Sequence, residues 1–330
     1  PIYLAVNKID APEHFNNIAD FYALAVGDPH PISALHGSGG VGDLLEAITE
    51  DFVIDENKTE SDIIKLAIVG KPNAGKSSIV NALLGEERVI VSDVSGTTRD
   101  SIDSKVKYEG EEFILVDTAG IRKKAKVEWG VEKFAVDRAI RAIKDCDIAV
   151  LVIDAIDGLT DQDKKISQIV VESGKGLIVA VNKWDLVEDK DKQDPTAKYT
   201  QKLMHEAPFL DFAPKIFVSA KTKQRLVNIY KQANEVYEQC TKRVSTSILN
   251  KVLLEAMAMN PPTTKKGKKL RVYYATQVRT APPTFILFVN DEDLVQDSYK
   301  RYLENKMREA FGFFGTPIRM SFRERKEKGN

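Results

Sequence analysis

The sequence predicts an α/β fold built on a doubly wound sheet, and three observations predict it. The first is an apolar strand pattern over Ile63–Val69, followed by a helical pattern over Ser77–Leu84. The second is the string at Gly70–Ser77, Gly-Lys-Pro-Asn-Ala-Gly-Lys-Ser, which matches the phosphate-binding pattern G-x-x-x-x-G-K-[ST]. The third is that polar strings suited to a nucleotide follow later apolar strands. We therefore expect a complete nucleotide-binding domain over residues 63–240.

The phosphate loop is the strongest of these signals. Gly70 and Gly75 permit close approach of the backbone, whose N–H groups and following helix N-terminus favour an anion. Lys76 is expected to reach the β- and γ-phosphates, and the Ser77 hydroxyl to hold Mg²⁺. A Gly-rich turn with a surface lysine is the alternative, which the flanking strand and helix disfavour. The expected phosphate contacts are Gly70, Lys71, Pro72, Asn73, Ala74, Gly75, Lys76, Ser77 and Ser78.

The choice of base is predicted by Asn182-Lys183-Trp184-Asp185, which ends the apolar strand Leu177–Val181. The Asp185 carboxylate can accept hydrogen bonds from N1–H and the exocyclic amine of guanine. Adenine cannot offer this pair of donors, and an unpaired buried carboxylate costs about 1–3 kcal/mol. The string Ser219-Ala220-Lys221 follows the strand Lys215–Val218 and fits the loop that backs the base. Either string alone is a weak signal, but both in order after the phosphate loop predict GTP.

Switch elements are expected between these strings. Asp117-Thr118-Ala119-Gly120 closes the strand Glu112–Val116, so Asp117 is placed to hold Mg²⁺ and the Gly120 N–H to sense the γ-phosphate. Gly96–Asp100 precedes the strand Ile102–Tyr108, and a threonine there can ligate Mg²⁺ while the γ-phosphate is present. We favour Thr98 over Thr97 as that ligand.

The catalytic device differs from that of Ras-like proteins, in which a Gln shortly after D-x-x-G orients the attacking water. Here Ile121-Arg122-Lys123-Lys124 follows Gly120. Asn73 offers a substitute, because its amide oxygen can help to coordinate a monovalent cation beside the phosphates. An ordinary turn residue is an equally good interpretation of Asn73. The expected catalytic set is Lys76, Asn73, Thr98 and Gly120.

Composition excludes several classes of protein. The 330 residues are 43% hydrophobic, which suffices for two or three domain cores, and no apolar run approaches the ~20 residues of a membrane span. Cys146 and Cys240 are isolated, which favours two buried thiols in a reducing cytosol over a disulfide. The net charge of −1 is unevenly distributed along the chain. Residues 241–330 contain 18 Lys and Arg and 9 Asp and Glu. This excess predicts a polyanionic partner for the basic segment.

An imperfect internal repeat occupies the start of the chain. Residues 1–10 align with 176–185, and residues 31–35 with 216–221; helical patterns follow over Val41–Phe52 and Arg225–Cys240. We expect residues 1–53 to be the C-terminal remnant of a first GTPase domain without a nucleotide site of its own, and 54–62 a linker. The remnant positions that correspond to base-binding residues are Asn7, Lys8, Asp10, Ser33 and Ala34.

Residues 241–330 read α-β-β-α-β. The expected elements are a helix over Val244–Met259, a basic loop over Lys265–Lys269, strands over Leu270–Val278 and Phe285–Val289, a helix over Ser298–Phe311 and a strand over Thr316–Phe322. This order with basic loops resembles a KH-type RNA-binding unit. The Gly312-Phe-Phe-Gly315 string precedes the last strand, where we interpret it as a helix C-cap and turn rather than the KH clamp.

Taken together, these motifs resemble the bacterial Der or EngA family of tandem-domain GTPases. The resemblance covers the whole chain and includes Tyr273–Gln277, Phe288–Asp291 and Ala310–Pro317 in the last domain. It implies a GTPase that is Mg²⁺-dependent and potassium-stimulated, with Asn73 helping to bind potassium and Ile121 marking the absent catalytic Gln. It also implies action in assembly of the large ribosomal subunit, through ribosomal RNA, in the cytoplasm and as a monomer off the ribosome.

Two other functions share some of these motifs. The G domain of a tRNA-modifying enzyme shares Asn73 and the Gly96–Asp100 pattern, but no cofactor-binding or methylene-transfer domain is recognisable here. The regulatory G domain of a membrane transporter is disfavoured because no spanning segment is present in the sequence.

Overall fold

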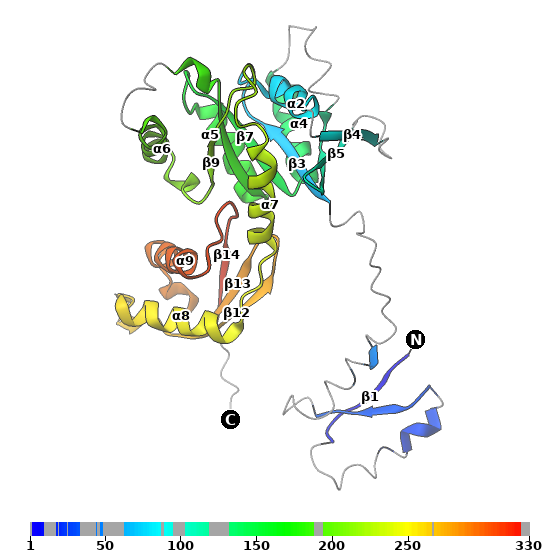
Figure 1. The fold of residues 1–330 in the computed structure, drawn as a ribbon. Coiled ribbons are helices and arrows are strands. Elements are labelled where there is room, and N and C mark those ends of the chain that lie inside the picture. Colours follow the sequence, from blue (N-terminus) through cyan, green and yellow to red (C-terminus); the bar gives the residue numbers. More distant parts are fainter. Residues whose placement is uncertain are drawn as a thin grey trace. The chain divides into compact units, whose positions relative to one another are not determined.

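The computed structural model describes residues 2–9, 18, 20–24, 26–33, 44, 47–48, 63–86, 89–94, 103–118, 132–187, 194–265 and 267–324. The chain divides into two compact units, residues 1–62 and 63–330 (Figure 1). None of the helices within these ranges is both long and apolar enough to cross a membrane.

The first unit contains a two-stranded parallel sheet. Strand β1 (Leu4–Val6) pairs with β2 (Pro29–Pro31), in the register Leu4 with Pro29. Val6, Ile9 and Ile18 form a small buried cluster against these strands. The helix expected over Val41–Phe52 lies largely outside the described residues.

The second unit begins with the sheet domain. Its elements are β3 (Ile64–Val69), α2 (Lys76–Leu84), β4 (Val89–Val94), β5 (Asp103–Tyr108), β6 (Glu111–Leu115), α4 (Glu132–Asp145), β7 (Ile148–Asp154), α5 (Asp161–Glu172), β8 (Gly176–Asn182), α6 (Pro195–Glu206), β9 (Lys215–Phe217) and α7 (Asn228–Thr241), with short 3-10 turns η4 (Trp184–Leu186) and η6 (Pro208–Leu210). Seven of these described strands form one sheet in the order β4-β5-β6-β3-β7-β8-β9. The sheet is parallel except for the antiparallel pairs β4–β5 and β5–β6.

Helices cover both faces of this sheet (Figure 1). The central strands are buried on both sides, as every residue of β7 and β8 shows, which explains their continuous apolar sequences. Val150 and Val152 pack with α2 and α7, whereas Leu151 and Ile153 pack with α4, α5 and α6. The doubly wound α/β prediction is thereby confirmed. Both thiols are free and buried, and burial raises the pKa of Cys146 to about 12 and that of Cys240 to about 11.

The C-terminal domain is a three-stranded sheet covered by two long helices. It comprises α8 (Thr246–Met259), β10 (Thr264–Lys265), β11 (Lys268–Lys269), β12 (Val272–Arg279), β13 (Thr284–Val289), η7 (Glu292–Leu294), α9 (Asp297–Phe311) and β14 (Arg319–Glu324). β12 pairs antiparallel with β13, which pairs parallel with β14. The predicted α-β-β-α-β order is present, but the expected basic loop contains a short hairpin, β10–β11.

The Gly312–Gly315 segment docks this domain onto the sheet domain. Gly312 has φ +88° and caps α9, as the sequence predicts. The Gly315 carbonyl accepts from the Leu177 N–H (2.7 Å), and its own N–H donates to the Phe212 carbonyl (2.6 Å). A Cβ on Gly315 would collide with Val236 of α7. Gly312 therefore serves the turn that ends α9, and Gly315 serves the contact between the two domains.

Arginine side chains reinforce the same contact. The Arg308 guanidinium donates to the carbonyls of Phe313 (2.6 Å) and Thr316 (3.0 Å), and it lies 4.8 Å from the centre of the Phe212 ring. Arg319 donates to the Glu172 carbonyl at the end of α5 (2.6 Å). These contacts lie at the amino end of β8, opposite the end that carries the nucleotide motifs.

Candidate functional site

The predicted phosphate loop connects β3 to α2, and its two outer glycines leave no room for a side chain. A Cβ on Gly70 would collide with the Val152 carbonyl, and one on Gly75 with the Asn182 amide. Gly75 is the N-cap of α2 at φ +95°, without a side-chain cap or an acidic residue in the first turn. A helix N-terminus with these properties attracts an anion.

Lys71 and Lys76 tie the loop to its surroundings. The Lys71 ammonium pairs with the Asp157 carboxylate (2.8 Å). The backbone N–H of Lys71 donates to the Asp163 carboxylate (3.3 Å). Asp163 is fully buried and also forms the capping box of α5 with Thr160. The Lys76 ammonium donates to the Lys71 carbonyl (2.6 Å) and so lies over the hollow of the loop.

Of the other loop residues, Ala74 is buried, Ser77 is half-buried in the first turn of α2, and Pro72, Asn73 and Ser78 are exposed. Asn73 adopts φ +63°, a left-handed conformation that asparagine tolerates better than most residues. This conformation suits the turn interpretation of Asn73, whose side chain is exposed.

Asn182 joins the phosphate loop to the predicted base loop. Its side-chain amide donates to the Ala74 carbonyl (2.9 Å), and its carbonyl oxygen accepts from the Ala220 N–H (3.0 Å). Asn182 is buried, so loss of either hydrogen bond would leave a buried polar group unsatisfied, at a cost of about 1–3 kcal/mol. Sequence strings 108 and 38 residues away are thereby held in one place.

The base loop itself is closed by local hydrogen bonds. The buried Ser219 hydroxyl accepts from the Thr222 N–H (3.1 Å), while Lys221 is exposed. Asp185 lies in η4, directly after β8.

A second buried charge supports Lys183. Its backbone is left-handed, at φ +62°, and its ammonium pairs with Asp154 at the end of β7 (2.5 Å). Burial by itself would raise the pKa of Asp154. The hydrogen bond and charge of Lys183, with the Ile156 N–H, outweigh burial and lower that pKa below its ordinary value. Asp154 is therefore ionised at neutral pH and orients Lys183.

On the other side of the loop, Asp117 and Thr118 follow β6. The Asp117 N–H donates to the Asp103 carboxylate (3.0 Å), and its backbone is left-handed at φ +56°. The Thr118 hydroxyl is buried against that of Ser104 (3.0 Å). Oxygens of the Ser77 hydroxyl and the Asp117 carboxylate are the hard donors that Mg²⁺ prefers, so this pair fits the expected metal.

The other expected residues divide into two groups. Thr98, Ala119 and Gly120 of the switch elements lie outside the described residues, as do Asp10 and Ala34 of the first unit. Asn7, Lys8 and Ser33 of the first unit are described: Asn7 and Lys8 follow β1, Lys8 is left-handed at φ +73°, and Ser33 is buried after β2.

The supporting carboxylates Asp154, Asp157 and Asp163 were not predicted from the sequence. Asp154 offered a signal, because it ends the apolar strand β7 as Asn182 ends β8. Asp163 offered none beyond a helix-capping pattern, since its contact with Lys71 spans 92 residues.

The carboxyl ends of β3, β6, β7, β8 and β9 therefore converge on one place, which is where open α/β sheets bind ligands. The predicted phosphate loop with its lysine lies beside the predicted base loop, and η4, directly after β8, carries the carboxylate of Asp185. This arrangement can hold a nucleoside triphosphate by both ends.

Comparison with known proteins agrees with this geometry. Residues 65–183 match the family model described as a 50S ribosome-binding GTPase, and residues 243–323 the KH-domain-like C-terminal domain of EngA bacterial GTPase enzymes. GTPase Der of Geobacillus sp. (strain WCH70) is 50% identical over 99% of this chain and 74% of its own length. GTPase Der of Staphylococcus carnosus (strain TM300) is 50% identical over 98% and 74%.

Among solved structures, Era bound to MgGDPNP and nucleotides 1506–1542 of 16S ribosomal RNA is similar with a TM-score of 0.40 and 20% identity, over 79% of this chain and 92% of that one. The two relatives share half of their residues with this chain along nearly its whole length, which is enough to assign the family. The chain belongs to the Der family of GTPases.

Proposed function

We propose that this GTPase acts as a switch in assembly of the large ribosomal subunit, associated with the ribosome in the cytoplasm. The observation that carries the proposal is one compact unit that holds both a nucleotide site and a basic KH-like domain. The description of the matching model as 50S ribosome-binding supports the choice of the large subunit.

Within the nucleotide site we assign roles by position. Lys76 neutralises the β- and γ-phosphates, Ser77 and Asp117 hold Mg²⁺, and Asp185 reads guanine. Thr98 completes the Mg²⁺ ligands and the Gly120 N–H senses the γ-phosphate, so that both segments change contacts when that phosphate leaves. Asn182 bridges phosphate loop and base loop, as its two hydrogen bonds suggest.

Potassium is the proposed catalytic cation. Asn73 is exposed on the phosphate loop, and Gly120 is followed directly by Ile121-Arg122-Lys123-Lys124 rather than by a Gln. Hydrolysis should therefore be slow and faster in KCl than in NaCl at equal ionic strength, with Asn73→Ala removing the difference. Equal rates in the two salts would leave Asn73 as a turn residue.

The proposed domain organisation is a remnant of a first GTPase domain over 1–53, a linker over 54–62, the complete domain over 63–240 and the KH-like domain over 241–330. The parallel β1–β2 pair supports the first assignment, because β8 and β9 pair in the same way. Ribosomal RNA is the proposed partner of the last domain.

The decisive experiment is co-sedimentation with purified 50S and 30S subunits in the presence of GDP, GTP or a non-hydrolysable GTP analogue. We expect binding to 50S that depends on the nucleotide and weakens steeply with salt, since each neutralised phosphate releases counterions. Sedimentation of the protein alone should give a monomer. Binding to neither subunit, with any nucleotide, would reject the ribosomal role and leave the GTPase assignment intact.

A further inference from the structure

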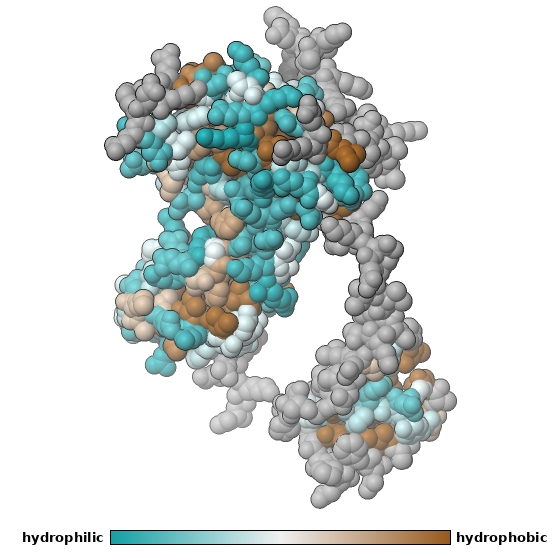
Figure 2. Space-filling view, in the orientation of Figure 1, coloured by the Kyte–Doolittle hydropathy of each residue, from teal (hydrophilic) through white to brown (hydrophobic). Residues whose placement is uncertain are grey.

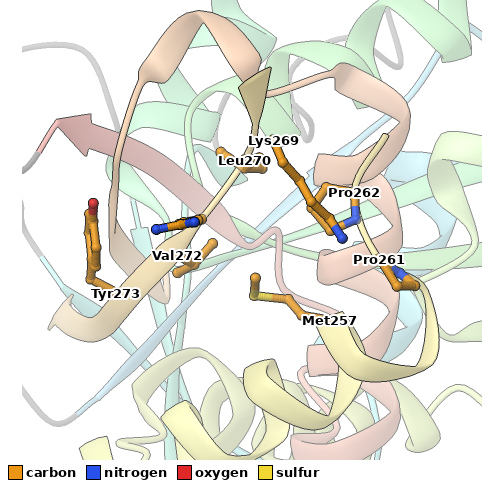
Figure 3. Close-up of a pocket in the computed structure, with 8 residues that line it drawn as sticks. Met257, Pro261, Pro262, Lys269, Leu270, Val272 and Tyr273 are labelled. Carbon is orange, nitrogen blue, oxygen red and sulfur yellow. The ribbon is translucent and has the colours of Figure 1, made fainter. Parts of the chain in front are cut away.

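The C-terminal domain contains a cavity of about 440 Å³ between the end of α8 and the start of β12. Its lining residues are Met257, Pro261, Pro262, Lys269, Leu270, Arg271, Val272 and Tyr273. Figure 3 shows Met257 rising from α8 into the hollow, Lys269 extending toward Pro262, and Tyr273 on the opposite side. The volume is within the range of small-ligand sites.

The floor of the cavity is apolar. Leu270 and Pro262 are buried, and Met257 is half-buried. Figure 2 shows hydrophobic residues gathered on the C-terminal domain, in contrast to the mostly hydrophilic surface of the sheet domain. Such a floor suits a flat, partly apolar group.

A β-bulge directs Tyr273 to this site. Val272 pairs with Val289 and Tyr274 with Phe288, so β12 has one residue more than its partner at Tyr273. Bulges re-aim side chains and recur beside functional sites. Both tyrosines are 43% exposed, but Tyr274 stacks on Phe288 with ring centres 4.4 Å apart, whereas Tyr273 lines the cavity.

The walls are held in place by hydrogen bonds. The Asn290 side chain accepts from the Arg271 N–H (2.8 Å) and donates to the Lys269 carbonyl (3.1 Å). On the facing wall, the Tyr299 hydroxyl donates to the Asn260 carbonyl (3.0 Å). The cavity is therefore preformed, and a ligand does not have to order it.

The charge around the cavity selects a polyanion. Residues 260–280 contain six Lys and Arg and no Asp or Glu. The lining residues Lys269 and Arg271 are exposed, and Lys268 is exposed beside them, with Asp291 4.0 Å from its ammonium. An apolar floor with an aromatic wall and a cationic rim matches a base attached to phosphates on both sides.

The Gly312–Gly315 string does not compete for this role, because Gly312 and Gly315 pack against Gln239 and Val236 of the sheet domain. We propose that the cavity binds an unpaired nucleobase of single-stranded RNA, with Tyr273 against the base and Lys269 and Arg271 beside the flanking phosphates. The inference rests on the proposed function in taking RNA as the partner.

The test uses the full chain and a fluorescently labelled single-stranded RNA dodecamer, with binding followed by anisotropy. Tyr273→Ala should weaken binding about 5- to 150-fold, the range for losing one stacked base. Tyr274→Ala is the matched control, with the same side chain and exposure one residue away, and Tyr273→Phe keeps the ring. Both should stay within about twofold of the unmodified chain.

A second probe separates base from backbone. It is the same dodecamer with bases removed at alternate positions. The unmodified chain should bind it about as weakly as Tyr273→Ala binds the intact RNA, and Tyr273→Ala should lose nothing further. Crosslinking with 4-thiouridine RNA should label the peptides that contain Met257 or Tyr273. Arg271→Glu should lower the salt dependence of binding, which Tyr273→Ala leaves unchanged.

Equal binding of intact and base-free RNA, equal losses for Tyr273→Ala and Tyr274→Ala, or crosslinks confined to other peptides would each overturn the proposal. Unchanged GTP binding and thermal unfolding in Tyr273→Ala verify that the fold is intact. The 50S co-sedimentation is independent of these results. Binding to 50S without a Tyr273 effect rejects the cavity alone, and Tyr273-dependent RNA binding without 50S binding rejects the ribosomal role alone.

Discussion

The two parallel strand pairs, β1–β2 and β8–β9, have nearly the same backbone. The Ile32 N–H donates to the Val6 carbonyl at 2.8 Å, as Val218 does to Val181. The next bond along, from Ile9 to Ile32, is 3.1 Å long, as is that from Trp184 to Val218. Lys8 and Lys183 are both left-handed, at φ +73° and +62°.

The two pairs differ in what accompanies them. The Asn182 side chain connects Ala74 of the phosphate loop with Ala220 of the base loop, and the Asn7 side chain, among the contacts that the described residues show, accepts from the Lys8 N–H (2.8 Å). Local sequence is therefore enough to build the backbone of a base loop. A nucleotide site also needs the phosphate loop, and the G-x-x-x-x-G-K-[ST] pattern occurs at 70–77 alone in these 330 residues.

The sharpest test of this difference removes the phosphate-binding charge. Lys76→Ala should lower GTP turnover about 100- to 1,000-fold, because the transferred phosphoryl group loses a preorganised cation. Phosphate release measures the rate. Lys8→Ala in the first unit, where Lys8 is the counterpart of Lys183, should leave turnover unchanged. Substantial hydrolysis by Lys76→Ala would place the phosphates elsewhere.

Guanine recognition should likewise depend on the second unit and not on the first. Asp185→Asn replaces an acceptor by a donor facing guanine, so GTP affinity should fall about 100-fold and xanthosine triphosphate should bind better than GTP. Competition with a fluorescent nucleotide gives both affinities. Asp10→Asn is the control, and a loss of GTP affinity there would show that the first unit also reads guanine.

The asparagine pair gives a smaller effect. Asn182→Ala should weaken GDP binding about 5- to 150-fold through one or two unsatisfied groups, while Asn7→Ala should have no effect. Calorimetry should count one guanine nucleotide per chain of 330 residues. A stoichiometry of two, or equal losses in both variants, would mean that the two strand pairs function alike.

The mildest prediction concerns Asp154 and the Lys183 conformation. Because its pKa in the folded protein is lowered, the ionised form stabilises the fold above the ordinary pKa of about 4, and this contribution is lost as pH falls through the lower, folded value. Asp154→Asn should therefore cost about 1–3 kcal/mol in urea unfolding at pH 7. The difference should shrink toward pH 3, and a difference independent of pH would assign Asp154 a packing role.

The sequence predicted much of this arrangement and missed particular parts for physical reasons. Strand β3, helix α2 and the ends of β8 were placed within a residue because continuous apolar runs and a glycine loop are local signals. The antiparallel edge strand β4 was not predicted, although four of its six residues are valine or isoleucine, because its run of three apolar residues is too short to indicate a strand. The β10–β11 hairpin was expected as a loop, because lysine-rich pairs resemble solvent-exposed coil.

The candidate site shows the same contrast. The motif residues were found individually, and their convergence followed from their places at strand ends. The pairing of Lys71 with Asp157 and Asp163 joins two segments about 90 residues apart, and neither segment contains a local pattern that predicts the contact. The bulge at Tyr273 likewise depends on the register with β13, which the sequence of β12 does not contain.

The docking of Gly315 against Leu177 and Val236 bears on how this protein is made. Translation produces the sheet domain first, and domains generally fold in that order. The amino end of β8 and the flank of α7 around Val236 then stay uncovered until Gly315 is added, 138 positions after Leu177 and 79 positions after Val236. The nascent chain therefore carries an uncovered edge that its own last domain later covers. Substitutions at Gly315 should thus reduce the yield of folded protein made in cells more than they reduce the activity of the molecules that succeed.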